Sequence, residues 1–420
     1  MTTVVAIDDT DSRDGMCTTY LAALVADELA SEGGVERLLL VRLNPAVAAK
    51  TRGNAACAVH ADVPTDEARR VASALVDRHA ATDERTSPGL VVASGDPADV
   101  PRGVRQFARV AVRDHLSLSD ALATAEAAGY VHEGWSGGRG RIGALAAVGA
   151  WAAFDEWTHE RLVYRPRERW GTERGVETES VFAAAADAYP AAWDTVDREA
   201  DEAVCVPATP GPVLFGIRGD EAHVVEGVAD RVAHEAAERA ATFHTNQGTD
   251  AHLREAALAA VEAGRSYRVD ATVATAPETR AGGHVHLTLR DGDAMLPAVA
   301  FEPTKRFRDR VRALRAGDRV TACGEVGGGS LKLEKVAVRD LNRTELVTPT
   351  CPDCGRSMSS AGANAGYRCR DCGTAEDGRV ERAVERAVEA GWYEVPPRAR
   401  RHVAKPLARG GFDGPTHPER

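Results

Sequence analysis

Two Cys-x-x-Cys units near the C-terminus place the strongest constraint on how this chain can fold. Cys351 and Cys354 form one unit and Cys369 and Cys372 the other, with fourteen residues between them and a glycine after each. Four thiolates on two such turns can surround Zn²⁺ tetrahedrally at about 2.3 Å. Because no fifth ligand or open position is evident, the pattern predicts a structural zinc ribbon. The doubled motif with its matching glycines argues against a redox dithiol pair or a chance arrangement.

Length, composition and the N-terminal residues indicate a multidomain globular protein. A chain of 420 residues exceeds one ordinary core, and 44% hydrophobic with 27% charged residues is the balance of a globular protein. No stretch approaches the about 18 apolar residues of a membrane span. The start, MTTVVAIDDTDS, lacks the basic and apolar regions of a secretory signal. We therefore expect a cytoplasmic protein whose cysteines bind metal or are buried thiols.

The net charge of −11 is unexpected for a protein that binds nucleic acid, since Lys and Arg normally neutralise the phosphates. Lysine is scarce, whereas Arg, Asp, Glu and Ala are abundant. The lysines are Lys50, Lys305, Lys332, Lys335 and Lys405. An acidic, lysine-poor surface suits a salt-rich cytoplasm, where a Debye length of about 3 Å at 1 M screens the repulsion of RNA. We infer a halophilic source.

The first part of the chain combines strand and helix patterns. Apolar runs with strand character occupy residues 3–7, 38–43, 55–63 and 89–95, and helical patterns occupy 18–29, 66–80 and 104–116. This alternation predicts an α/β domain over residues 1–130. Residues 131–258 hold an apolar helix from Ile142, a strand at 213–219 and an expected helix over 220–241. That mixture suits a small split β-α-β sandwich.

From residue 265 the hydrophobic pattern changes to a period of two. The expected strands are residues 267–276, 284–291, 295–303, 318–326 and 331–341, with a helix at 304–315. Five strands with one interposed helix predict an OB-type barrel over residues 264–344, a fold that often binds single-stranded nucleic acid. Another small barrel, SH3-like and purely structural, is the alternative. The zinc ribbon should span 348–376 and a basic C-terminal segment 377–420.

An acidic loop follows the first strand. Carboxylates such as Asp8, Asp9 and Asp11 at a strand end can converge on Mg²⁺, which in turn holds substrate phosphates. Gly15 and its neighbours then lead into a helix whose free N–H groups and positive dipole end suit a phosphate. The hydroxyl of Thr18 is available as a phosphoryl acceptor or metal ligand. An ordinary acidic turn with a threonine N-cap explains these residues equally well.

Other polar loops are candidate ligand sites. Two of them suit phosphate binding. The first loop contains Gly138, Arg139, Gly140 and Arg141, and the second contains Lys50 and Arg52. The first lacks the GK[ST] of a Walker A motif, and a plain helix-entry loop or a solvated turn is the alternative for each. The segments 209–220 and 244–252 are rich in turn and hydrogen-bonding residues. Asn246 and Asp250 could face a cationic or nucleotide ligand, and a capping role is equally compatible.

Two basic stretches stand out, residues 305–319 and 398–409. Trp392 and Tyr393 precede the second stretch, and rings combined with positive charge are typical of RNA-binding surfaces. We predict that the second stretch contacts RNA. Ion pairing along a helix face and a disordered tail are the respective alternatives.

These segments, in this order, resemble the archaeal tRNA 2-agmatinylcytidine synthetase family over nearly the whole chain. The resemblance is carried by IDDTDSRDGMCTTYLA, RLNP, KTRGNAA, GRGRIGALAAVGA, TPGPVLFGIRG, YRVDATV, GGHVHLTL, AFEPTKRFRDRVRALRAGD, both Cys-x-x-Cys units and YEVPPRARRHVAKPL. It implies an α+β multidomain fold: a kinase-like domain, a ferredoxin-like domain, an OB fold and a zinc ribbon. It also implies ATP-dependent ligation of agmatine to C2 of the wobble cytidine in the isoleucine tRNA with a CAU anticodon. A phosphorylated cytidine is the intermediate, and decoding changes from AUG to AUA.

The resemblance also implies roles for individual residues. Thr18 matches the family threonine that becomes phosphorylated, and Asp8, Asp9 and Asp11 match its acidic Mg²⁺ loop. Nucleotide binding is assigned to Gly15, Lys50, Arg52, Gly138, Arg139, Gly140 and Arg141. Agmatine binding is assigned to Thr209, Pro210, Gly216, Arg218, Gly219, Asn246 and Asp250. The OB fold and ribbon would hold the tRNA, and no obligate protein partner is evident. The alternative is a non-catalytic OB and zinc-ribbon protein that binds RNA or single-stranded DNA.

Overall fold

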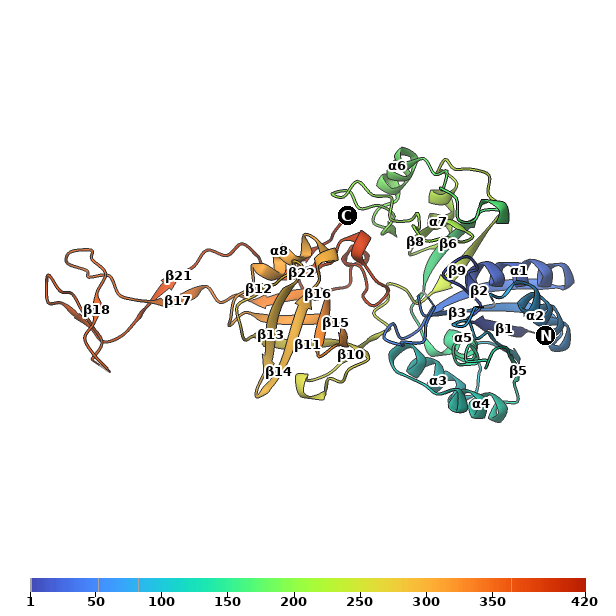
Figure 1. The fold of residues 1–420 in the computed structure, drawn as a ribbon, viewed down its shortest axis with the longest axis horizontal. Coiled ribbons are helices and arrows are strands. Elements are labelled where there is room, and N and C mark those ends of the chain that lie inside the picture. Colours follow the sequence, from blue (N-terminus) through green and yellow to red (C-terminus); the bar gives the residue numbers. More distant parts are fainter. Residues whose placement is uncertain (1, 52, 82, 364) are drawn as a thin grey trace.

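Three parts follow one another along the long axis of the molecule: a sheet covered by helices, a β-barrel, and a small zinc-ribbon module (Figure 1). The computed structural model describes residues 2–51, 53–81, 83–363 and 365–420. Within these ranges, no helix combines the length and the apolar character needed to cross a membrane.

The N-terminal half of the sheet has the order β5-β4-β1-β3-β2, with antiparallel neighbours. The strands are β1 (Thr3–Asp8), β2 (Gly34–Arg42), β3 (Ala55–Asp62), β4 (Gly89–Ser94) and β5 (Val131–Gly134). The helices are α1 (Thr18–Glu32), α2 (Thr65–His79), α3 (Arg102–Arg113), α4 (Leu118–Ala127) and α5 (Arg141–Ala153). α1 and α2 pack on one face and α3, α4 and α5 on the other. Because both faces are covered, the central strands are apolar throughout.

The second half of the sheet continues the first without a break. It adds β9 (Arg239–Thr245), β6 (Thr158–Tyr164), β8 (Val213–Gly219) and β7 (Ala192–Trp193), covered by α6 (Thr178–Ala188) and α7 (Ala222–Ala229). β9 pairs in parallel with β2. The expected helix over 220–241 was wrong in its second half, because α7 ends at Ala229 and β9 follows. The expected boundary after residue 130 does not coincide with a break either, since β5 and α5 pack with the N-terminal strands.

The barrel confirms the OB-type prediction. Its strands are β11 (Arg265–Val273), β13 (Val285–Asp291), β14 (Ala294–Ala300), β15 (Arg319–Gly327) and β16 (Ser330–Asp340), with α8 (Phe307–Arg312) between β14 and β15. Pairing of β11 with both β13 and β15, and of β16 with both β14 and β15, closes the barrel. Side chains that alternate inward along each strand, such as Val269 and Leu287, form its core.

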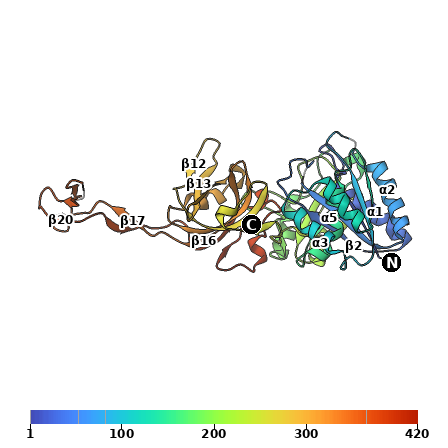
Figure 2. The same cartoon turned by 90° about the horizontal axis from the view of Figure 1, so that it is seen from below.

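The ribbon stands away from the barrel on a two-stranded stalk (Figures 1 and 2). The stalk pairs β17 (Thr344–Val347) with β21 (Val380–Ala383). The ribbon holds β18 (Ser359–Ser360), β19 (Tyr367–Arg368) and β20 (Ala375–Glu376). Short elements elsewhere are β10 (Leu253–Glu255), β12 (Glu278–Thr279), η1 (Arg167–Arg169), η2 (Leu258–Ala260) and η3 (Glu302–Thr304).

The C-terminal segment returns from the stalk and docks on the barrel and the sheet. It contains β22 (Gly391–Glu394), η4 (Pro397–Ala399), η5 (Leu407–Arg409) and β23 (Thr416–His417), and β22 extends the barrel sheet beside β16. Arg400 is buried between Asp194 and Glu394. The segment is therefore no free tail, and its charge at Arg400 is neutralised inside the protein rather than offered to RNA.

Candidate functional site

A buried acidic cluster lies where β1 ends in the middle of the sheet. Asp9 adopts a left-handed backbone conformation (φ 55°), which Asp tolerates better than most residues. Its backbone N–H donates to Asp8 Oδ1 at 2.7 Å. Arg139, from the glycine-rich segment before α5, donates to Asp9 Oδ2 at 2.6 Å, and Thr51 donates to Asp9 Oδ1 at 3.3 Å. The loop after β1, the loop after β2 and the start of α5 therefore meet at one point.

Glycines at the start of α5 allow this close approach. A methyl group at Gly143 would overlap Asp8 Oδ2, and one at Gly140 would overlap the Asp8 carbonyl oxygen. The N-cap of α5 is Gly140, which has no side chain to cap the helix, and the first turn contains no acidic residue. The positive end of the α5 dipole therefore faces the acidic cluster.

Burial raises the pKa of the Asp8 carboxyl well above its usual range, and the charges of Asp9 and Asp11 raise it further. Burial also raises the pKa of Asp9, although Arg139 opposes this rise. Like charges held together at low dielectric favour a proton or a cation. Mg²⁺ prefers oxygen ligands of this kind, but among the described residues only the four ribbon cysteines bring three or more metal-ligating atoms within 4.8 Å of one another.

Thr18 is the first residue of α1 and is buried close to the acidic loop. Thr10 Oγ1 donates a hydrogen bond to Thr18 Oγ1 at 3.1 Å. The side chain of Cys17, the N-cap of α1, accepts no hydrogen bond from the backbone N–H groups of the first turn, and that turn contains no acidic residue. The helix thus begins with backbone N–H groups available to an anion beside the Thr18 hydroxyl.

A cavity of about 190 Å³ opens beside the acidic cluster. Its lining includes Asp8, Asp9, Asp11, Lys50, Thr51, Asn54, Ala111, Asp114, His115, Arg139 and Gly140. Burial lowers the pKa of Lys50. Among the residues assigned to nucleotide binding, Lys50, Arg139 and Gly140 thus lie together here.

The other described residues assigned to nucleotide binding lie outside the lining of this cavity. Arg141 folds back onto its own loop, where its Nε donates to the Gly138 carbonyl oxygen at 2.9 Å. A methyl group at Gly15 would lie against the Trp170 ring. Arg52 falls outside the described residues.

A second cavity, of about 170 Å³, is lined by residues from both halves of the sheet and by the two chain neighbours of Thr18. Its lining includes Cys17, Thr19, Leu40, Arg42, Glu160, Arg174, Thr209, Pro210 and Gly211. Glu160 is buried, and burial alone would raise its pKa, but Arg218 and Arg42 hold the pKa below its usual value. Thr209 and Pro210, which were assigned to agmatine binding, line this cavity, and Arg218 contacts its Glu160 at 3.1 Å.

The remaining residues of the expected agmatine site are used in other ways. Asn246 bonds the backbone of Arg42 with both ends of its amide, at 2.7 Å and 3.0 Å. Asp250 forms an ion pair with Lys335 of the barrel at 2.9 Å. Gly216 packs against Leu162 and Gly219 against the Ala191 carbonyl oxygen, and neither lines the second cavity. In this structure Asn246 and Asp250 hold the framework together and lie outside the second cavity, contrary to the expectation.

Sequence reasoning missed Arg42 and Glu160, which form the charged wall of the second cavity. Arg42 ends β2 and Glu160 lies in β6, and their side chains meet at 3.0 Å. Arg42 begins the RLNP stretch of the resemblance, but no role was assigned to it, and Glu160 belongs to none of the quoted stretches. The available signal was the alternation in THERLVY, which places Glu160 on the same side of the strand as Leu162.

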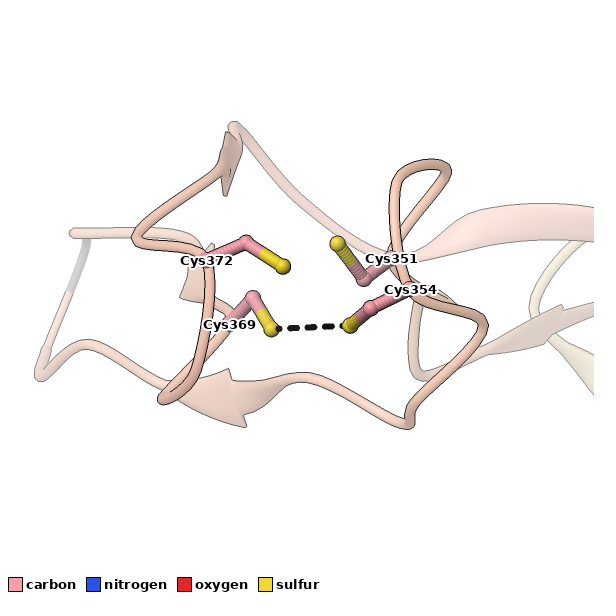
Figure 3. Close-up of side chains that lie close together, drawn as sticks. All are labelled: Cys351, Cys354, Cys369 and Cys372. Atoms are coloured by element: carbon pink, nitrogen blue, oxygen red, sulfur yellow. Dashed lines mark hydrogen bonds between the residues drawn. The ribbon is translucent and has the colours of Figure 1, made fainter.

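The four cysteines of the ribbon converge as their spacing predicted (Figure 3). Their sulfur atoms all lie within 4.8 Å of one another, and Cys354 Sγ and Cys369 Sγ are 3.5 Å apart. Desolvation opposes ionisation of Cys351, yet backbone N–H groups of Cys354 and Asp353 lower its pKa to about 7. Thiolates at these separations fit tetrahedral Zn²⁺.

Comparison with known proteins finds matches along the chain. Three family models match: the TiaS TCKD domain over residues 4–64, the TiaS FLD domain over 138–252 and the TiaS C-terminal zinc ribbon domain over 348–388. A relative from Haloquadratum walsbyi, the 2-agmatinylcytidine synthetase TiaS of an isoleucine tRNA, is 50% identical, with 100% of both chains covered. The protein of that name from Methanosarcina mazei is 43% identical, with 97% of both chains covered.

Solved structures match over the same extent. The crystal structure of TiaS in complex with its isoleucine tRNA and ATP superposes with a TM-score of 0.90 at 39% identity, covering 100% of both chains. The complex of TiaS with the same tRNA, AMPCPP and agmatine gives 0.88 at 37% identity with the same coverage. Similarity of sequence and of fold therefore extends over the full length of each protein.

Proposed function

Since this chain belongs to the TiaS family of tRNA 2-agmatinylcytidine synthetases, we propose that it joins agmatine to the wobble cytidine of the isoleucine tRNA with a CAU anticodon, using ATP. The observation that carries the proposal is the position of Thr18. Its hydroxyl is bonded to Thr10 of the acidic loop, and its neighbours Cys17 and Thr19 line the second cavity. A hydroxyl bonded to the acidic loop, with chain neighbours that line the second cavity, suits a reaction that joins an activated base to an amine.

The first cavity is the proposed site of the ATP phosphates. Lys50, Arg139 and the uncapped start of α5 supply positive charge and N–H donors for phosphate oxygens. Asp8, Asp9 and Asp11 would hold Mg²⁺, which neutralises phosphate charge when bound. Phosphoryl transfer depends mainly on such positioning and neutralisation.

The chemistry requires two displacements. A phosphoryl group from ATP is transferred to the C2 carbonyl oxygen of the cytidine, which turns a poor leaving group into a phosphoester. The primary amine of agmatine then attacks C2, the C2–O bond breaks, the phosphate leaves with that oxygen, and the amine gives up a proton. The first transfer leaves ADP. Transfer of a second phosphoryl group to the Thr18 hydroxyl, followed by hydrolysis of that phosphoester, leaves AMP and inorganic phosphate. The role proposed for Thr18 is to accept a phosphoryl group, which suits a hydroxyl at an uncapped helix start.

The second cavity is the proposed agmatine site. Agmatine carries an amine and a guanidinium, which require carboxylate or carbonyl acceptors. The loop with Thr209 and Pro210 offers backbone carbonyl groups, and Glu160 brings a buried carboxylate whose two oxygens already accept bonds from Arg42 and Arg218. The adjacent position of Cys17 and Thr19 supports this assignment, because the amine must reach the reacting cytidine beside α1.

The barrel and the zinc ribbon are proposed to hold the tRNA, with Zn²⁺ in a structural role. We further propose that the protein works in the cytoplasm, where its tRNA substrate is used. A non-catalytic RNA- or DNA-binding protein receives less support, because full-length relatives at 50% and 43% identity are named as synthetases.

The test is mass spectrometry of the wobble nucleoside after incubation of the purified protein in molar KCl and Mg²⁺ with ATP, agmatine and unmodified isoleucine tRNA. The expected result is an ATP-dependent mass increase equal to agmatine minus water. Omission of ATP and a tRNA with a different wobble base are the controls. Folded protein that binds the tRNA but yields no adduct would favour the binding protein instead.

A further inference from the structure

Four arginines form a stripe along α3, in a protein whose arginines are mostly neutralised by carboxylates. The stripe consists of Arg102, Arg105, Arg109 and Arg113. At 3.6 residues per turn these positions fall within about 80° of the helix circumference. Val104, Phe107 and Ala111 point the other way, into the core of the sheet. The stripe is therefore the outer face of α3.

The positive charge of the stripe is uncompensated. Among the described residues, no carboxylate lies within 4.0 Å of any of the four guanidinium groups. α3 has no acidic residue in its first turn. Asp114, which directly follows the helix, is already shared by Arg254 and Arg265 at 3.0 Å each.

Neutral backbone groups hold two of these side chains in place. Arg109 Nε donates to the Ala153 carbonyl oxygen at 3.0 Å, and Arg113 Nε donates to the Ala251 carbonyl oxygen at 2.7 Å. The remaining guanidinium N–H groups are left for another acceptor. Burial and the neighbouring charges of Arg254 and Arg109 lower the pKa of Arg113, so an anion placed here would relieve repulsion.

Other basic stretches of the chain behave differently. Arg400 and Arg401 of the C-terminal segment bond buried carboxylates, and Arg306 near the start of α8 bonds Asp197. A stripe of unpaired arginines is therefore not a general consequence of composition in a chain of net charge −11.

The stripe also leads to the proposed reaction site. Ala111, Asp114 and His115, at the C-terminal end of α3, line the cavity beside the acidic cluster. Successive arginines from Arg105 to Arg109 to Arg113 are four residues apart, which is a rise of about 6 Å. That spacing is comparable to the distance between consecutive phosphates along one RNA strand.

We propose that the stripe on α3 binds the sugar-phosphate backbone of the substrate tRNA next to the target nucleotide and directs that strand into the cavity. This inference rests on the proposed function for the identity of the RNA. Arginine suits the role because its planar fork bonds phosphate bidentately. Backbone contacts fix the register of the strand without reading its sequence.

The test compares tRNA binding by the full-length wild type with that of R102Q/R105Q/R109Q, by fluorescence anisotropy across the KCl range in which circular dichroism shows folded protein. We expect the Kd for tRNA to rise at least about tenfold and the slope of log K against log [KCl] to lose about 2 units, because three phosphate contacts are removed. The KM values for ATP and agmatine should not change.

The matched control is R69Q/R70Q/R78Q, which removes three arginines from α2 on the opposite face of the sheet. It should bind tRNA like the wild type. The triple lysine variant R102K/R105K/R109K should keep most of the salt slope. If the triple glutamine variant folds poorly, R102Q/R109Q changes two exposed positions only and should lose a proportionate part of the slope.

Two outcomes separate this inference from the proposed function. In the first outcome, the folded glutamine variant binds tRNA with wild-type affinity and salt slope while the wild-type enzyme modifies the tRNA. That result would overturn the proposed role of the stripe and leave the proposed function intact. Loss of RNA binding by the variant, with no product from the wild type, would support the stripe and overturn the function.

Discussion

At the residue scale, Asp8 affects both the stability of the folded protein and the proposed cation site. Its carboxyl is enclosed by β1 and the start of α5, next to the charges of Asp9 and Asp11, and its pKa is raised well above the usual range. If this position had no function, a neutral residue would give a more stable fold than a buried carboxyl. The retained carboxyl costs stability, which is common where a site must hold a cation.

The Asp8→Asn variant should show this cost through pH. The folded protein keeps the Asp8 proton to a higher pH than the unfolded chain, so stability falls as pH rises from about 4 through the raised pKa. The variant lacks this ionisation. In EDTA it should therefore unfold at a higher temperature than the wild type at pH 7, and the difference should disappear towards about pH 4.

Thermal unfolding in molar KCl measures the effect. Added Mg²⁺ should raise the unfolding temperature of the wild type more than that of the variant, because the variant has lost a ligand. Product formation by the variant should be lost. If the difference in unfolding temperature between variant and wild type did not depend on pH, ionisation of Asp8 would not destabilise the folded protein.

Thr18→Ala should abolish modification and spare tRNA binding. The change removes one buried hydroxyl, bonded to Thr10, from the start of α1 and leaves the helix in place. Thr18→Ser keeps the hydroxyl and should keep measurable activity. Nucleoside mass spectrometry and anisotropy on the same preparations separate the two effects. Near-wild-type product from Thr18→Ala would remove Thr18 from the mechanism.

At the element scale, the zinc ribbon depends on its metal more than on a hydrophobic core. Its buried cluster is small and is built around Cys351, Met358 and Cys369. The β17 and β21 stalk holds it away from the barrel. A module of this size gains most of its folding free energy from four Zn–S bonds.

Removal of zinc should therefore unfold the ribbon and leave the rest of the protein folded. We expect one Zn²⁺ per chain by elemental analysis. In Cys351→Ser, or after chelation, limited proteolysis should cut within residues 348–388 while the sheet and barrel stay protected. Affinity for tRNA should fall. If zinc removal also abolished the cooperative unfolding transition of the sheet and barrel, the ribbon would be required for their stability.

At the scale of the whole molecule, buried ion pairs join the parts. Arg400 links Asp194 of the second half of the sheet to Glu394 of β22, and Lys335 of the barrel reaches Asp250. Buried pairs are screened by salt much less than exposed ones. The exposed acidic surface, by contrast, repels itself and RNA wherever salt is low.

Stability and activity should therefore require high salt. We expect full modification in about 1 M KCl and a marked loss near 0.1 M, as the Debye length grows from about 3 Å to about 10 Å. The relative from Haloquadratum walsbyi accords with such an environment. Activity and circular dichroism across a KCl series provide the measurement. Full activity in low salt with loss above 1 M would contradict the halophilic interpretation.

The sequence by itself determined the elements whose pattern is local. The spacing of Cys351, Cys354, Cys369 and Cys372 defines a metal knuckle, and the period-two alternation after residue 265 defines the barrel strands. The apolar run of β1 followed by acids placed the acidic loop at a strand end. In each case the residues that interact are close in sequence or repeat with one period.

Only the tertiary structure decided what depends on distant segments. Residues 233–241 are rich in alanine and suit a helix, yet β9 begins at Arg239 because β2 and β6 offer hydrogen-bonding edges on both sides of it. Glu160 and Arg42 meet in the second cavity, while Asp250 turns to Lys335. Ion pairs between residues that are distant in sequence therefore determine which charged residues remain available to ligands. Local sequence patterns do not show these pairs.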